Sequence, residues 1–221
     1  MTQGIAFFDF DDTLARGDSI LPFLLYCIRK RISPRRQLVK AAGAFLYWKL
    51  RPSRPSRASR AKSATLSFLK GRSADEMLDV ARAFFRDEYL PRFYQDGLTE
   101  LWSLRSQGMK LVVVSASPDV YMRALPEFMP IDAVLSTRCE VGGDGRYTGQ
   151  VGENCKGEEK VRRIEQYLKE NGFVLDMKCS SAYGDSPSDA DMMALVNRAV
   201  LVNPKKALLR RRPDGIVVHW T

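Results

Sequence analysis

The sequence predicts an α/β protein with a parallel sheet and a helical domain inserted behind its first strand. Two observations predict this fold class. Short apolar runs alternate with helical patterns along most of the chain, which is typical of βα units and a parallel sheet. Between the first apolar run and the helical pattern that begins at Leu98 lie roughly eighty residues without a strand pattern, far more than a βα connection needs.

Five apolar runs are expected to form the sheet, because each is short and is bounded by polar or turn residues. They span residues 5–8, 111–114, 133–135, 181–184 and 199–202. Helical patterns between them cover residues 98–107, 158–171 and 189–195. The glycine-rich segment 140–152 favours a β-hairpin.

The segment behind the first strand is predicted to be helical throughout. Its apolar spacing gives helices over residues 21–30, 38–50, 58–69 and 74–89, separated by prolines and a glycine. We therefore expect residues 1–17 and 97–221 to form the core domain. Residues 18–96 would form a helical cap over it.

The charge of the 221-residue chain is uneven. The net charge is +9, and residues 29–72 hold many Lys and Arg but no Asp or Glu. Such a block suits an anionic partner: a phosphorylated substrate, nucleic acid or an anionic membrane surface. A solvated helical face explains it equally well. One hypothesis for the protein is therefore a binding module whose basic segment contacts nucleic acid or a membrane surface. It is the alternative to the enzyme that the acidic residues below indicate.

The cysteines and the N-terminus predict a reduced, cytoplasmic protein. The four cysteines form no Cys-x-x-Cys pair and the chain has a single histidine, so we expect no zinc site. Neither a signal-peptide pattern nor an apolar stretch of membrane-spanning length is present in the sequence.

The first apolar run ends in the acidic segment Phe8-Asp9-Phe10-Asp11-Asp12-Thr13-Leu14. On an extended chain Asp9 and Asp11 can point the same way, because side chains alternate. One carboxylate can attack phosphorus, and the other can protonate the leaving oxygen and then activate water. An acidic turn with Thr13 as a helix cap is the structural alternative.

Later strand ends carry further acids. Asp185 follows the run 181–184, and Asp189 follows shortly after it. Ligands of parallel sheets bind outside the carboxyl ends of the strands, so these carboxylates are expected to join Asp9 at one edge. Clustered carboxylates repel one another unless a cation joins them, and oxygen ligands beside a phosphate suit Mg²⁺. Asp189 can at the same time be a helix N-terminal charge.

Phosphate binding is predicted from one serine and one lysine. Ser115 ends the strand 111–114, where a hydroxyl and backbone N–H groups can hold phosphate oxygens. Ser117 is interpreted as a helix cap before Pro118. Lys156 precedes a helix and would balance the charge of the phosphoryl group, with Lys160, one turn later, as the competitor.

These four segments, in this order, resemble the haloacid dehalogenase (HAD) superfamily. The resemblance covers essentially the whole chain. The first motif, Asp-x-Asp-x-Thr, matches Asp9, Asp11 and Thr13. The later motifs match Ser115, Lys156, and Asp185 with Asp189.

The resemblance implies a Rossmann-like core with a cap of the C1 type, closest to the subfamily IB, phosphoserine phosphatase-like hydrolases. It implies Mg²⁺-dependent hydrolysis of a phosphate monoester, with Asp9 as nucleophile and Asp11 as acid/base. Mg²⁺ would be held by Asp9, the backbone carbonyl of Asp11, and Asp185, with Asp189 in support. Ser115, Lys156 and Thr13 would bind phosphate.

The expected substrate is a small phosphorylated metabolite such as phosphoserine or histidinol phosphate. A phosphotransferase or mutase of the same superfamily is the alternative enzyme. Asp18 stands where phosphoserine phosphatases carry a glutamate, and Thr65 lies near the place of their cap arginine. Asp18 is therefore a candidate for substrate specificity.

Overall fold

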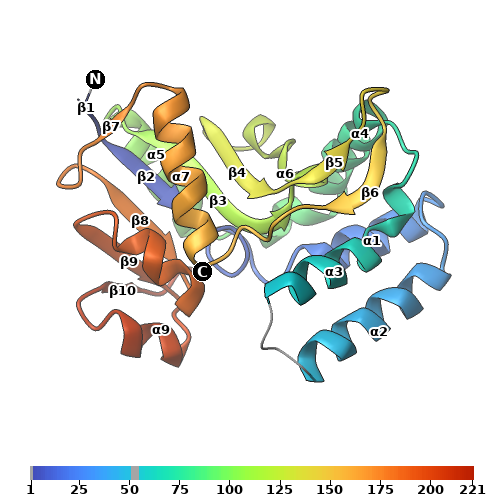
Figure 1. Ribbon diagram of the computed structural model, residues 1–221. Coiled ribbons are helices and arrows are strands. Elements are labelled where there is room, and N and C mark those ends of the chain that lie inside the picture. The colour runs from blue at the N-terminus through green and yellow to red at the C-terminus, as the bar shows by residue number, and fades with distance from the viewer. Residues whose placement is uncertain (1, 51–54) are drawn as a thin grey trace.

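A parallel sheet is the centre of the fold, as expected from the sequence, and it has six strands. The computed structural model describes residues 2–50 and 55–221 (Figure 1). The strand order is β10-β9-β8-β2-β3-β4, and every neighbouring pair is parallel. Its strands are β2 (Ile5–Phe8), β3 (Lys110–Pro118), β4 (Ala133–Thr137), β8 (Ser181–Gly184), β9 (Arg198–Val202) and β10 (Ile216–Val218).

The five expected strands are confirmed, and β10 is an addition. It forms an edge of the sheet, and Ile216 and Val217 are exposed. An exposed edge strand of three residues leaves no apolar pattern long enough to detect. The short strands β1 (Thr2–Gln3) and β7 (Val174–Leu175) pair separately.

Side chains of β2 alternate between the two faces of the sheet, so both faces are covered. Ala6 and Phe8 join one buried cluster, together with Leu101 of α5 (Gln95–Ser106). Ile5 and Phe7 join the other. Residues of α7 (Glu158–Glu170), α8 (Ala190–Met193) and α9 (Lys206–Arg211) complete that second cluster. The central strand is therefore buried on both sides.

Between β2 and β3 the described residues form mostly helices. These are α1 (Ile20–Arg29), α2 (Arg36–Leu50), α3 (Pro55–Thr65), α4 (Ala74–Phe84) with the π-helical turn Phe85–Tyr89, and α5. Figure 1 shows α1, α2 and α3 beside the sheet rather than over one of its faces. Short 3₁₀ turns occupy Ser67–Leu69 and Leu90–Arg92. No helix of the described ranges is long and apolar enough to cross a bilayer.

The expected hairpin is formed by β5 (Cys139–Val141) and β6 (Tyr147–Val151). It reaches toward the helical segment, as the two yellow strands in Figure 1 show. Gly71 N donates to the carbonyl of Tyr147 at 2.8 Å, and Tyr147 N donates to the carbonyl of Arg72 at 2.9 Å. Backbone bonds therefore tie the helical segment to a part of the chain that follows β4. The short helix α6 (Asp119–Met122) directly follows β3.

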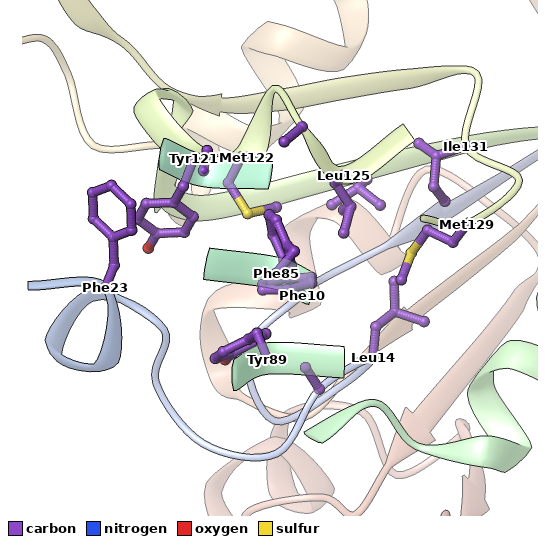
Figure 2. Packing of buried hydrophobic residues seen from close by; sticks show 14 of the residues in the cluster. Phe10, Leu14, Phe23, Phe85, Tyr89, Tyr121, Met122, Leu125, Met129 and Ile131 are labelled. Carbon is purple, nitrogen blue, oxygen red and sulfur yellow. The ribbon is translucent and has the colours of Figure 1, made fainter. Parts of the chain in front are cut away.

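Aromatic side chains anchor the loop that follows β2. The ring of Phe10 contacts those of Phe85, Tyr89 and Phe93, with centroids 5.8 to 6.3 Å apart. Figure 2 shows Phe10 among Phe85, Tyr89 and Leu14. Such ring pairs add stability beyond the area that they bury. The backbone between Asp9 and Asp11 is therefore held by a buried side chain.

Candidate active site

A tight turn follows β2 and carries three aspartates. Asp12 has φ +60°, in the left-handed region that Asp and Asn tolerate better than most residues. Its N–H donates to the carbonyl of Ala15 at 2.7 Å, and its Oδ1 accepts from Gly17 N at 2.9 Å. The turn therefore holds its own geometry, with Asp9 and Asp11 on either side of Phe10.

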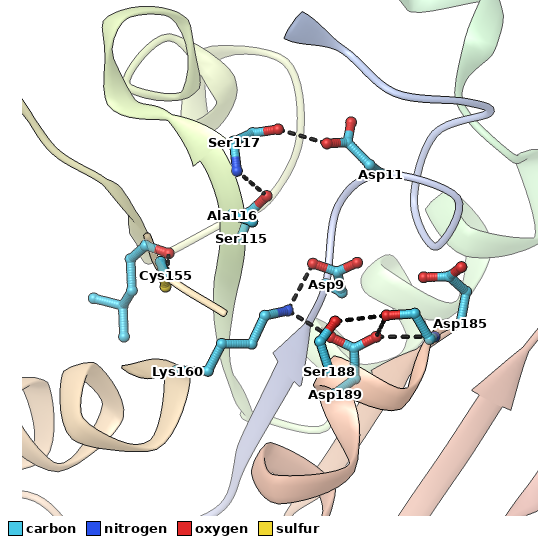
Figure 3. A network of polar contacts seen from close by, with 12 residues as sticks. Asp9, Asp11, Ser115, Ala116, Ser117, Cys155, Lys160, Asp185, Ser188 and Asp189 are labelled. Atoms are coloured by element: carbon cyan, nitrogen blue, oxygen red, sulfur yellow. Dashed lines mark hydrogen bonds and ion pairs between the residues drawn. The ribbon is translucent and has the colours of Figure 1, made fainter. Parts of the chain in front are cut away.

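Lys160 joins two carboxylates at the strand ends. Its Nζ donates to Asp9 Oδ1 and to Asp189 Oδ1, both at 2.7 Å, and the side chain is 1% exposed (Figure 3). Asp189 Oδ2 accepts from Ser186 N at 3.0 Å and from Ser186 Oγ at 2.9 Å. Burial opposes the charge of Lys160, but the carboxylates of Asp189 and Asp9 outweigh it and raise the pKa of the lysine. Lys160 therefore stays protonated.

Three buried carboxylates face one another here. Asp9, Asp185 and Asp189 offer oxygens that lie within 4.8 Å of one another. Asp185 Oδ2 accepts from Lys205 Nζ at 2.5 Å, although Lys205 is itself about half exposed. Burial raises the pKa of Asp9 to about 8; Lys160 opposes this rise, and the charges of Asp189 and Asp185 add to it.

This donor set fits a divalent cation such as Mg²⁺. Its oxygens are hard ligands, and the two lysines that contact the cluster, Lys160 and the half-exposed Lys205, carry fewer charges than the three carboxylates when all are ionised. The expected cluster of Asp9, Asp185 and Asp189 is thus brought together by the fold.

Asp11 lies apart from that cluster and contacts the end of β3. Its Oδ2 accepts a hydrogen bond from Ser117 Oγ at 2.5 Å. Its Oδ1 is buried and has no hydrogen-bond partner within the described residues. Burial raises the pKa of Asp11 to about 7, with a further rise from the charge of Asp18 and an opposing effect of the Ser117 hydroxyl. A carboxyl group with such a pKa can both give and take a proton near neutral pH.

The hydroxyls of Ser115 and Thr13 are both buried beside this turn. Ser115 Oγ accepts from Ser117 N at 3.0 Å. Thr13 Oγ1 has no partner in the part of the chain that the structure describes. Thr13 is no helix cap, since Ser19 is the residue that precedes α1. Asp18 is exposed and accepts from Ile20 N at 3.0 Å.

The expected lysine, Lys156, is not the one that meets the nucleophile candidate. Lys156 is exposed and precedes Gly157, the residue before α7, whereas Lys160 lies inside the helix and reaches Asp9. The sequence carried a signal for this. Lys160 shares the inward face of α7 with Ile164, one turn later, and a lysine on an apolar helix face needs a buried partner.

Sequence reasoning assigned no role to Lys62 of α3. Its Nζ donates to the carbonyl of Ala116 and, at 2.5 Å, to Asn154 Oδ1. Burial lowers the pKa of Lys62 to about 8, while the charges of Asp11 and Asp18 oppose that change. The helical segment thus places a cation beside the end of β3. No spacing rule predicts it, because α3 and β3 are far apart in the sequence.

Comparison with known proteins gives a family match and similar sequences. Residues 6–194 match the family model described as haloacid dehalogenase-like hydrolase. Protein CicA of Caulobacter vibrioides is 30% identical over 197 residues, which cover 86% of this chain and 82% of that protein. The histidinol-phosphatase of Neisseria meningitidis serogroup C is 26% identical over 208 residues. The matched region covers 93% of this chain and 93% of that protein.

Solved structures share the fold at lower identity. A protein with unknown function from Bordetella pertussis Tohama I superposes with a TM-score of 0.85 at 23% identity, over 99% of both chains. A phospho-aspartyl intermediate analogue of phosphoserine phosphatase gives a TM-score of 0.62 at 18% identity, over 98% of this chain and 93% of that one. Both matches extend over the helical segment as well as the sheet.

Proposed function

Because the chain belongs to the haloacid dehalogenase-like hydrolase family, we propose that it hydrolyses phosphate monoesters through an aspartyl-phosphate on Asp9. The family membership confirms the resemblance seen in the sequence. One observation carries the proposal: Asp9 lies at the end of a central strand, bonded to the buried Lys160 and facing two more carboxylates. The phospho-aspartyl analogue among the solved structures supports an intermediate of this kind.

The residues divide the reaction between them. Asp9 attacks phosphorus with one oxygen while Lys160 holds the other through its 2.7 Å bond to Oδ1. Asp11 gives its proton to the leaving oxygen. The same group, now a carboxylate, takes a proton from the water that splits the aspartyl-phosphate. Ser115 and Thr13, both buried beside the turn, are proposed to contact the phosphate oxygens.

Mg²⁺ is the proposed cofactor. Asp9 and Asp185 would hold it with the backbone carbonyl of Asp11. Asp189 would act in support, because both of its oxygens already accept hydrogen bonds. When bound, the ion neutralises charge on the phosphoryl oxygens and lowers the repulsion between phosphate and the carboxylates.

We propose that residues 18–96 cap the site and select the substrate, while residues 1–17 and 97–221 form the core. Lys62 supports this, since it brings a charge from α3 to the end of β3. Asp18 is close enough to raise the pKa of Asp11 and is proposed to contact the substrate. A small phosphorylated metabolite fits, such as the histidinol phosphate suggested by one relative or phosphoserine.

The test is a screen of phosphorylated metabolites with Mg²⁺, including phosphoserine, histidinol phosphate and nucleotides. Release of inorganic phosphate without any acceptor is expected for at least one of them, and it should stop when EDTA is added. Transfer that requires an acceptor alcohol would instead identify a phosphotransferase or mutase. No turnover of any ester would contradict the proposed function.

Mg²⁺ should stabilise the protein more at pH 8 than at pH 6. The raised pKa of Asp9, about 8, means that the metal-free folded state keeps a proton that the unfolded chain loses near pH 4. That contribution to stability is present at low pH and is lost as the pH rises toward 8. Mg²⁺ binds the ionised carboxylates, so its stabilisation grows over the same range.

Melting temperatures by scanning fluorimetry check this. Saturating Mg²⁺ should raise Tm by about 5 °C or more at pH 8. Equal ionic strength from NaCl is the control, and Asp185→Asn should remove most of the shift. An equal shift in that variant, or a larger shift at pH 6 than at pH 8, would contradict the metal assignment.

A further inference from the structure

A chain of three buried hydroxyl groups ends on the acid/base candidate Asp11. Tyr121 OH lies 2.8 Å from Ser19 Oγ, which lies 2.8 Å from Ser117 Oγ. Ser117 Oγ in turn lies 2.5 Å from Asp11 Oδ2. Ser19 and Tyr121 are fully buried and Ser117 is 4% exposed, so water does not compete for these bonds. Figure 3 shows Ser117 turned toward Asp11.

The direction of hydrogen-bond donation along the three hydroxyl groups follows from counting their protons. A hydroxyl group has one O–H to donate, and an ionised carboxylate only accepts. Ser117 donates its one O–H in the hydrogen bond to Asp11 Oδ2. It must therefore accept the hydrogen bond that it shares with Ser19. Ser19 has then used its own proton and must accept from Tyr121. The three donors consequently point one way, toward Oδ2.

This arrangement makes the two oxygens of Asp11 unequal. Oδ2 is occupied by a short hydrogen bond, while Oδ1 is buried and has no partner in residues 2–50 and 55–221. A proton on Oδ2 would point at the Ser117 O–H. All three hydroxyl groups would then have to reverse the direction in which they donate their hydrogen bonds. A proton on Oδ1 meets no such conflict.

We propose that Ser117, backed by Ser19 and Tyr121, is a positioning residue that leaves Oδ1 as the oxygen through which Asp11 delivers and takes its proton. The inference rests on the proposed role of Asp11. It also gives the helical segment a part in the chemistry, because Ser19 is the residue immediately before α1. The ring of Tyr121 packs on Phe23 of that helix, with centroids 4.8 Å apart (Figure 2).

A series of leaving groups tests this, because protonation matters most when the leaving oxygen is a poor one. We would measure kcat/KM for p-nitrophenyl phosphate, phenyl phosphate and an alkyl phosphate with Mg²⁺. Ser117→Ala should lose about 10- to 100-fold on the alkyl ester and about threefold or less on the p-nitrophenyl ester. Tyr121→Phe keeps the ring and should show the same trend more weakly. Ser106→Ala, an exposed serine of α5, is the matched control.

Asp11→Asn separates the proposed acid/base role of Asp11 from the proposed positioning role of the three hydroxyl groups. If it steepens the dependence on the leaving group while Ser117→Ala and Tyr121→Phe lower all three esters equally or not at all, the hydroxyl chain has no positioning role. If Asp11→Asn itself leaves the dependence unchanged, Asp11 is not the acid, and the proposed function of that residue fails together with this inference. Circular dichroism of each variant excludes misfolding as the cause.

Discussion

Asp9→Asn should abolish phosphatase activity while the protein stays folded. The substitution removes the attacking oxygen, and the loss of a covalent nucleophile costs at least about 10⁴-fold in kcat. Asparagine has nearly the same size, and its amide oxygen can still accept the bond from Lys160 that Asp9 Oδ1 accepts now. Hydrolysis of p-nitrophenyl phosphate with Mg²⁺ measures the activity, and circular dichroism measures the fold.

The matched control for this variant is Asp75→Asn. Asp75 is an exposed residue in the first turn of α4, remote in sequence from every strand end of the sheet. It should keep full activity. If Asp9→Asn were as active as Asp75→Asn, phosphate would have to be transferred to another group or directly to water, and the nucleophile assignment would be wrong.

Lys160→Met should lower the free energy of unfolding by about 3–5 kcal/mol, because it leaves Asp9 and Asp189 buried without their cation. Activity should also fall, since Asp9 loses the group that holds it. Urea unfolding in EDTA measures the stability.

Lys156→Met provides the comparison within the same segment. Lys156 is exposed, so its replacement should change the unfolding free energy by no more than about 0.5 kcal/mol. Equal losses of stability and activity in the two variants would show that the burial of Lys160 has no special consequence. A larger loss of activity in Lys156→Met would instead support Lys156, the lysine that the sequence motif indicated, as the phosphate-binding residue.

Most of the sheet could be predicted from local patterns. The strand Ile5–Phe8 is a run of four apolar residues buried on both faces, and the acids directly behind it mark the edge where ligands bind. The meeting of Asp9 with Asp185 follows from parallel strands ending at one edge. What failed was local interpretation of polar residues. Ser117 looked like a helix cap, yet its hydroxyl bonds to Asp11.

The sequence motif did not show which of the two lysines, Lys156 or Lys160, contacts Asp9, and the reason is different. A motif fixes a position along the chain, but a side chain reaches a site only if its helix turns the right face toward it. Gly157 precedes α7 with φ +61°, and the helix that begins at Glu158 directs Lys160 inward. The burial of Lys62 and the hydroxyl chain through Ser19 depend on contacts between distant segments, and no pattern within either segment encodes such contacts.

The strand β2, which ends directly before Asp9, pairs with strands that lie far along the chain, and this has a consequence for how the protein folds. Ile5 pairs with Lys110, and Ala6 pairs with Ser181. The two pairings are 105 and 175 residues apart in the sequence. Closing such long loops is slow, because the entropy of the intervening chain must be lost before any contact forms. A nascent chain leaving the ribosome would therefore expose the apolar run Ile5–Phe8 until β3 has been synthesised. We expect β2 to join the sheet late, after α1 to α4 have formed.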